Sequence, residues 1–155
     1  MKYLLLFTIC VLVFETPVLA QTKASEKAVI DAVKAFYAGF SDGRFADAQT
    51  YTTDDWNHIN PFGGRTVGRE AVLKEVRAVH STFLKGVTDT PEMFEVNFPS
   101  ATVASVVVPS RLSAFTTPDG VKHENDRNIR TFILVKRNGR WLIKLDHNTF
   151  IQAQP

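Results

Sequence analysis

The residues best suited to chemistry in this chain are its histidines, because an imidazole gains or loses a proton near neutral pH. The sequence has four of them. His80 and His147 are the candidate general bases, and His58 is a third pocket candidate. Asn60 and Arg130 add an amide and a guanidinium that stabilise developing negative charge. Proton transfer of this kind contributes about 10²- to 10⁴-fold to a rate.

Other catalytic chemistries leave no signature. The sequence has no phosphate-binding loop, dinucleotide-binding glycine pattern or Ser-His-Asp arrangement. Zinc held by His58, His80, His147 and a carboxylate is the sharper alternative, but these histidines lack the short spacing of a local metal motif. We therefore predict no metal ion and no cofactor.

The N-terminus predicts export. Met1-Lys2 precedes an apolar run that ends near Phe14, and Val18-Leu19-Ala20 places a small residue before a cleavage point, as in a secretory signal peptide. The run is shorter than the roughly 20 residues of a membrane span. We expect a signal peptide at residues 1–20, one domain at residues 21–155, a periplasmic or secreted location, and no membrane association after cleavage. Cleavage also removes Cys10, the single cysteine.

The charge balance excludes one class of partner. The formal net charge is +2 at pH 7, whereas a nucleic-acid-binding domain needs a strongly basic face. We predict no nucleic-acid partner.

Hydrophobic spacing predicts helices early in the chain and strands later. Apolar residues recur with helical period over residues 25–40 and 69–83, and residues 44–51 form a shorter helix. Two short strands surround Asn60-Pro-Phe-Gly-Gly64. Alternation from Phe94 to Phe98 and over residues 101–117 indicates strands, with a bulge expected at Pro109. The order predicts an α+β fold with one antiparallel sheet against the helices.

The last hairpin sets the directions of the site residues. Asn138-Gly139 is a two-residue type I′ turn signal. If pairing runs without interruption from this turn, Arg130 lies opposite His147 where an aromatic face ends, and Asp146 faces away. A polar pair at the end of an apolar wall is typical of a small-molecule pocket. The alternative is that both side chains reach solvent at the margin of the sheet.

Several short motifs occur in an order that resembles a known family. Asn60 lies in a strand, Gly68-Arg69-Glu70 opens a helix that carries His80, and the last strand holds Trp141 and His147-Asn148-Thr149. This pattern resembles the SnoaL-like branch of the nuclear-transport-factor-2-like superfamily, in particular its SgcJ/EcaC-type proteins, over about residues 25–150. The resemblance implies a cone-shaped fold: a curved antiparallel sheet packed on about three N-terminal helices.

The resemblance implies a pocket for a small hydrophobic or amphipathic molecule and a homodimer formed through the outer face of the sheet. The residues expected to contact the ligand are Asn60, Arg130, His58, Trp56 and Asn148, and apolar lining is expected from Trp56, Phe62, Phe115 and Phe132. His80 lies on an apolar helix stripe, so a core histidine is the alternative there.

Three functions remain open at this stage. The first is a pocket protein that binds a small molecule, with or without weak acid–base catalysis. The second is an isomerase, cyclase or hydrolase that uses a pocket histidine as general base. The third is an oligomerisation module with a filled cone. An open pocket with a histidine within about 3.2 Å of a carboxylate would favour the enzyme.

Overall fold

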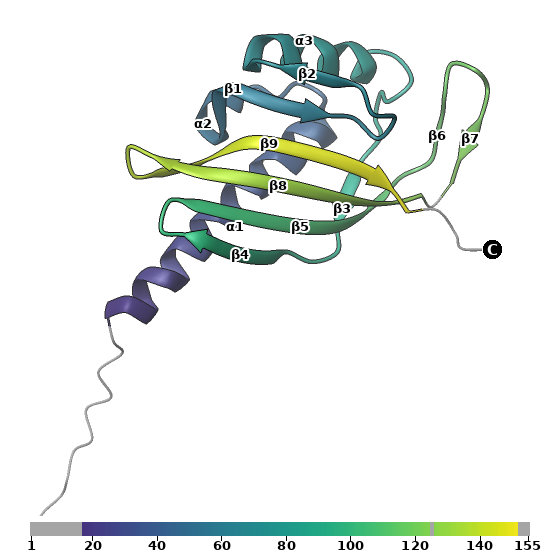
Figure 1. Ribbon diagram of the computed structural model, residues 1–155. Coiled ribbons are helices and arrows are strands. Elements are labelled where there is room, and N and C mark those ends of the chain that lie inside the picture. The colour runs from purple at the N-terminus through teal and green to yellow at the C-terminus, as the bar shows by residue number, and fades with distance from the viewer. Residues whose placement is uncertain (1–16, 125, 152–155) are drawn as a thin grey trace, which may run out of the picture.

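The computed structural model describes residues 17–124 and 126–151. Residues 1–16 of the predicted signal peptide therefore lie outside the described residues. Within the described part, the chain forms three helices and a curved sheet (Figure 1), which confirms the predicted α+β class. No helix in this part is long and apolar enough to cross a membrane.

The helices follow the predicted apolar stripes. They are α1 (Pro17–Asp42), α2 (Ala48–Tyr51) and α3 (Arg69–His80). Helix α1 ends where Gly43 adopts a φ of 66°, a left-handed conformation that a glycine reaches without strain. Asp42 closes this turn, because its Oδ1 accepts a hydrogen bond from the Arg44 backbone N–H at 2.7 Å.

The strands form a seven-stranded sheet in the order β2-β1-β9-β8-β5-β3, with β4 also paired to β5. Its pairs are antiparallel except for β1 and β9, which run parallel. A separate short hairpin joins β6 to β7. The strand bounds are β1 Thr52–Ile59, β2 Arg65–Val67, β3 Asp89–Pro91, β4 Glu95–Ser100, β5 Val103–Leu112, β6 Phe115–Thr116, β7 Lys122–His123, β8 Arg127–Arg137 and β9 Arg140–Phe150.

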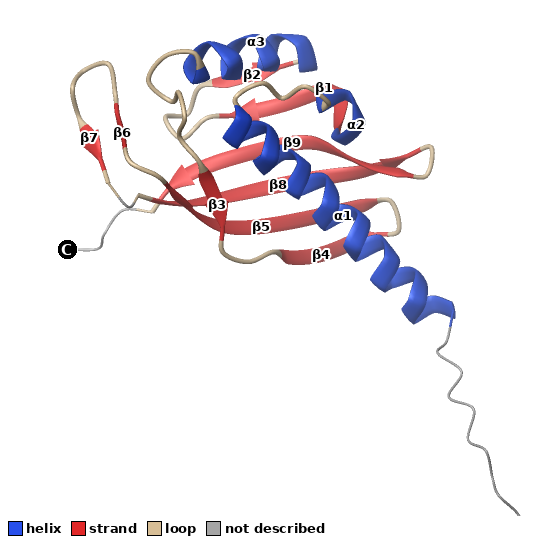
Figure 2. Cartoon of the chain, turned by 180° about the vertical axis from the view of Figure 1, so that it is seen from behind, coloured by secondary structure: helices blue, strands red, loops and turns tan. Residues whose placement is uncertain are grey.

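The core lies between the concave face of the sheet and the helices, and α1 runs diagonally across that face (Figure 2). Alternate residues of β5 from Ala104 to Leu112 are buried, as are alternate residues of β8 from Asn128 to Leu134. Phe36 of α1 packs edge-on against Phe132 at 5.2 Å between ring centroids. This face is therefore apolar in its middle and polar at one end, where Ser110, Asn128 and Arg130 are buried.

The prediction of a bulge at Pro109 is wrong. Pro109 pairs with Ile129 in a continuous register between β5 and β8. On its other side β5 pairs with β4 up to Val107 and with β3 from Ser110, so Pro109 faces the gap between those two strands. Its carbonyl accepts a hydrogen bond from the Glu92 N–H at 2.8 Å. Proline has no N–H to donate, and at this position neither neighbouring strand requires one.

A bulge does occur in β9, and it corrects the predicted pairing of the last hairpin. Asn138 and Gly139 have φ of 50° and 78°, as the type I′ turn requires. Leu134 then pairs with Ile143, but Ile133 pairs with Leu145, so Lys144 is the extra residue. Beyond it every β9 side chain changes face relative to uninterrupted pairing. Asp146 consequently points inward and His147 outward, the reverse of the prediction.

Candidate functional site

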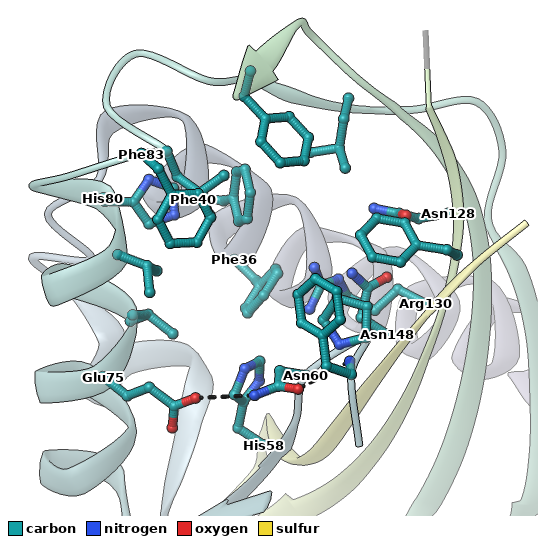
Figure 3. A pocket seen from close by; sticks show the side chains of 18 of the residues that line it. Phe36, Phe40, His58, Asn60, Glu75, His80, Phe83, Asn128, Arg130 and Asn148 are labelled. Atoms are coloured by element: carbon teal, nitrogen blue, oxygen red, sulfur yellow. Dashed lines mark hydrogen bonds between the residues drawn. The ribbon is translucent and has the colours of Figure 1, made fainter. Parts of the chain in front are cut away.

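A pocket of about 150 Å³ lies between α3, the end of α1 and the polar end of the concave face (Figure 3). Its wall is mostly apolar and rich in phenylalanine, which makes it suitable for an apolar ring. Three neighbouring strands contribute polar side chains to it: His58 of β1, Asn128 and Arg130 of β8, and Asn148 of β9. Asn60, Glu75 and His80 line it as well. The phenylalanine rings of the wall belong to Phe36, Phe40, Phe45, Phe62, Phe83, Phe115 and Phe150, so Phe62 and Phe115 lie where apolar lining was expected, whereas Trp56 and Phe132 do not line the pocket.

One buried carboxylate, Asp146, organises the polar end. His58 pairs with it across the β1–β9 ladder, and His58 Nδ1 lies 2.9 Å from Asp146 Oδ2 and 3.0 Å from Oδ1. Trp56 Nε1 donates to Oδ1 at 2.8 Å, and Arg130 Nη1 donates to Oδ2 at 2.7 Å. Three side chains from three positions of the sheet thus converge on a carboxylate that is fully buried.

The electrostatics keep this carboxylate charged. Burial alone would raise the pKa of Asp146, but His58, through its charge when protonated and its hydrogen bond, together with Arg130 and Trp56, holds that pKa below its usual value. Burial alone would lower the pKa of Arg130, yet Asp146 and Asp89 hold the pKa of the guanidinium above its usual value. An ionised Asp146 fixes the His58 tautomer, because Nδ1 must carry the proton that points toward the carboxylate.

A second buried carboxylate lies on the other side of Arg130. Asp89 of β3 is 2% exposed, and its Oδ2 is 3.7 Å from Arg130 Nη2. Burial raises the pKa of the neighbouring Tyr37 to about 12, with Arg130 opposing and Asp89 adding to the rise. Two carboxylates therefore share one guanidinium, so this group has a net negative formal charge while His58 is neutral.

Several polar atoms of the residues that line the pocket have no hydrogen-bond partner among the described residues. Both amide atoms of Asn128, Oδ1 of Asn148 and Nε of Arg130 are buried in this state. Leaving one such group unpaired costs about 1–3 kcal/mol. Buried groups that lack partners inside a pocket indicate a place where a ligand or solvent supplies them.

His147 is not part of this site. The residue is exposed, pairs with Thr131 rather than Arg130, and is not among the residues that line the pocket. The reason is the extra residue at Lys144, which turns it to the outer face. Trp56 is fully buried and also does not line the pocket, but it contacts the site indirectly through Asp146.

Asn60 lies at the pocket, yet its side chain is used by the hairpin between β1 and β2. Its Oδ1 accepts hydrogen bonds from the backbone N–H groups of Phe62 and Gly64, each at 3.0 Å. Its Nδ2 donates to Glu75 at 3.4 Å, as the dashed line in Figure 3 shows. Thr66 donates to the other oxygen of Glu75. Both ends of the Asn60 amide are therefore already used in hydrogen bonds within the protein.

His80 lines the pocket from α3 but has the environment of a core histidine. Its ring meets Phe40 edge-on at 4.5 Å and Phe45 at 5.6 Å. Burial lowers the pKa of His80, and a backbone hydrogen bond with Leu84 only partly opposes this. It stays a candidate by position, but no carboxylate among the described residues hydrogen-bonds to it.

The sequence reasoning missed Asp146 and Asn128. Uninterrupted alternation places Asp146 on the outer face, and Asn128 follows a polar loop segment without a distinguishing motif. Alternation along β8 from Arg130 does place Asn128 on the inner face, so that signal was present. Among the described residues no cluster of three or more histidine, cysteine or acidic side chains could hold a metal ion.

A curved sheet with helices over one face and a pocket that ends in buried polar groups defines a cone-shaped pocket protein. A model of the SnoaL-like domain matches residues 29–151. The chain therefore belongs to the SnoaL-like domain family. The narrower SgcJ/EcaC-type assignment stays a prediction.

Solved structures share the fold at low sequence identity. A cystatin-like-fold protein from Caulobacter vibrioides is 21% identical over 83% of this chain and 91% of its own, with a TM-score of 0.78. A nuclear-transport-factor-2-like protein from Streptomyces avermitilis is 15% identical over 84% and 99%, with a TM-score of 0.71. A hexachlorocyclohexane dehydrochlorinase is 17% identical over 86% and 89%, with a TM-score of 0.70. No curated protein matches the chain.

Proposed function

We propose that this protein binds a small hydrophobic or amphipathic molecule and moves a proton on it, with His58 as general base and Asp146 as the residue that orients His58. The observation that carries the proposal is the 2.9 Å contact between His58 Nδ1 and Asp146 Oδ2 beside an open pocket. A histidine within hydrogen-bond reach of a carboxylate is the geometry that distinguishes an acid–base site from a plain binding site.

Each member of the group has a separate task in this proposal. Asp146 holds the Nδ1 proton, so Nε2 of His58 is the nitrogen that accepts a proton from the ligand. The carboxylate then stabilises the imidazolium that forms. Arg130 and Trp56 keep the carboxylate ionised and fixed in direction. The reaction class is therefore proton abstraction from a carbon or hydroxyl, which leads to isomerisation or elimination.

Deuterium exchange tests this proposal without knowledge of the natural substrate. 2-Hydroxyacetophenone and acetophenone carry C–H bonds next to a carbonyl, and their exchange in D₂O is followed by proton NMR. We expect the protein to accelerate exchange of at least one probe above the buffer rate. His58→Gln should lower that acceleration by about 10²- to 10⁴-fold, because Gln cannot act as a base.

His147→Gln is the matched control, since it removes an imidazole that lies on the outer face. It should leave exchange unchanged. Loss of exchange in His147→Gln with full activity in His58→Gln would contradict the assignment. Exchange at the buffer rate in the wild-type protein would favour a binding function without catalysis.

We also propose that the protein is exported and forms a homodimer through the outer face of the sheet. No described helix covers this face (Figure 1), and Ile129 is 39% exposed on it. Ile133 and Leu145 pair side by side near its middle. Ile133→Glu should reduce the mass measured by sedimentation from two chains to one. Val67→Glu changes an exposed residue of β2 and should leave the mass unchanged.

A further inference from the structure

We propose that the substrate is a neutral molecule with a single ring, whose polar end both donates and accepts hydrogen bonds. This inference rests on the proposed function of the pocket and names the class of molecule that it takes. It follows from the volume of the pocket, the unpaired polar atoms of its wall and the charge behind them.

The volume and the wall set the size and the apolar part. A cavity of about 150 Å³ in an engineered protein core binds benzene, and this pocket has about the same volume. Phe36, Phe40 and Phe45 supply rings at its inner side, which favour edge-on contact with another ring. One six-membered ring fills this space, and a second ring would have to extend through the mouth.

The unpaired atoms define the polar end. Asn128 is fully buried, and neither its Oδ1 nor its Nδ2 has a partner among the described residues. Its amide therefore offers one donor and one acceptor whichever way round it is assigned. Asn148, directly across the ladder from Arg130, adds the acceptor Oδ1, and Arg130 adds the donor Nε.

A group that only accepts hydrogen bonds does not satisfy this wall. A carboxylate would pair with the donors of Asn128 and Arg130 but would leave the oxygens of both asparagines unpaired. It would also approach Asp146 and Asp89, which share one guanidinium. Both effects act against an anion.

A group that only donates fails in the opposite way. An amidinium would satisfy the two asparagine oxygens and leave Asn128 Nδ2 and Arg130 Nε without acceptors. It would also approach the guanidinium of Arg130, which is buried and charged. A neutral amide, or a hydroxyl beside a carbonyl, satisfies both kinds of atom at once.

Three probes of nearly identical shape separate these possibilities: benzamide, benzoate and benzamidinium. Their binding to the full chain is measured by titration calorimetry at pH 7, with toluene as the apolar reference. We expect benzamide to bind at least tenfold more tightly than benzoate or benzamidinium. Equal or tighter binding of either charged probe, or no binding of benzamide, would overturn the inference.

Asn128→Leu tests the residue that defines the polar end. Leu has the same branching and number of side-chain heavy atoms as Asn and no polar atom, so benzamide should lose about tenfold in affinity while toluene does not. Ser110→Ala is the matched control, because Ser110 pairs with Asn128 in the sheet and is equally buried, yet does not line the pocket. Its affinities should be unchanged. Unaltered benzamide affinity in folded Asn128→Leu would overturn the inference.

Asn148→Leu provides a second variant if Asn128→Leu does not fold, and it should weaken benzamide in the same direction. Binding and deuterium exchange measured on the same wild-type protein separate this inference from the proposed catalysis. Benzamide selectivity without exchange in the wild-type protein would refute the catalytic proposal and keep the ligand class.

Discussion

Asp146 shows how much one side chain can determine in a buried site. Its two oxygens accept from Trp56, His58 and Arg130, so the same carboxylate holds a base in position and neutralises a buried cation. Removing one partner of a buried ion pair costs much more than the pair contributes, because the other charge stays buried without compensation. The site and the stability of the fold therefore depend on the same residue.

Asp146→Asn should lower the free energy of unfolding by about 3–5 kcal/mol, because Arg130 loses its nearest counter-charge. Urea unfolding followed by tryptophan fluorescence measures this. Asp126→Asn is the control, since Asp126 Oδ2 lies 2.6 Å from His123 Nδ1 in a partly exposed pair. Its cost should be below about 1 kcal/mol. Similar losses in both variants would contradict the expectation that a buried ion pair costs more to break than an exposed one.

At the scale of elements, the extra residue in β9 decides which side chains reach the pocket. Lys144 is the unpaired residue between Ile143, which pairs with Leu134 of β8, and Leu145, which pairs with Ile133. Its Nζ lies 2.5 Å from Asp55 Oδ2 on β1. A strand alternates with period two, so one inserted residue reverses every later side chain. Without this bulge His147 instead of Asp146 would face inward, and the catalytic proposal would name a different histidine.

Deletion of Lys144 should therefore be far more damaging than its truncation. The deletion would turn His147 inward and Asp146 outward, and we expect a loss of several kcal/mol or failure to fold, because Arg130 and Trp56 would lose their shared acceptor. Lys144→Ala keeps the bulge and removes only an exposed ion pair, so it should cost less than about 1 kcal/mol. Thermal unfolding distinguishes the two. A folded deletion variant of near-normal stability would show that the strand can restore its register.

These elements also show what the sequence can and cannot predict. The period-3.6 stripe of residues 25–40, the Asn138-Gly139 turn and the alternation of Phe94 to Phe98 are local signals, and the structure has a helix, a hairpin and a strand there. A bulge is set by contacts across strands, so nothing in the local pattern around Lys144 marks it. The predicted hairpin pairs β8 with β9, as in the structure, but the one-residue shift puts Asp146 instead of His147 on the inner face.

At the scale of the whole molecule, two buried groups make stability depend on pH in separate windows. Burial lowers the pKa of His80 from its ordinary 6.5, so just below that pH the unfolded chain binds a proton that the folded chain does not. Asp146 has a pKa held below its ordinary 3.8, so the same imbalance recurs at a lower pH. In both cases acidification favours the unfolded state.

We expect the free energy of unfolding to fall as the pH drops below about 6.5 and to fall again below about 3.8, by about 1.4 kcal/mol for each unit of pKa difference. His80→Gln should flatten only the upper window, because Gln does not titrate, and Asp146→Asn should flatten only the lower one. Urea unfolding at pH values from 7.5 to 3 measures both. A profile that His80→Gln leaves unchanged between pH 7 and 5 would contradict the assignment of His80 as a buried, neutral core histidine, and would return it to consideration as a base that titrates in the pocket.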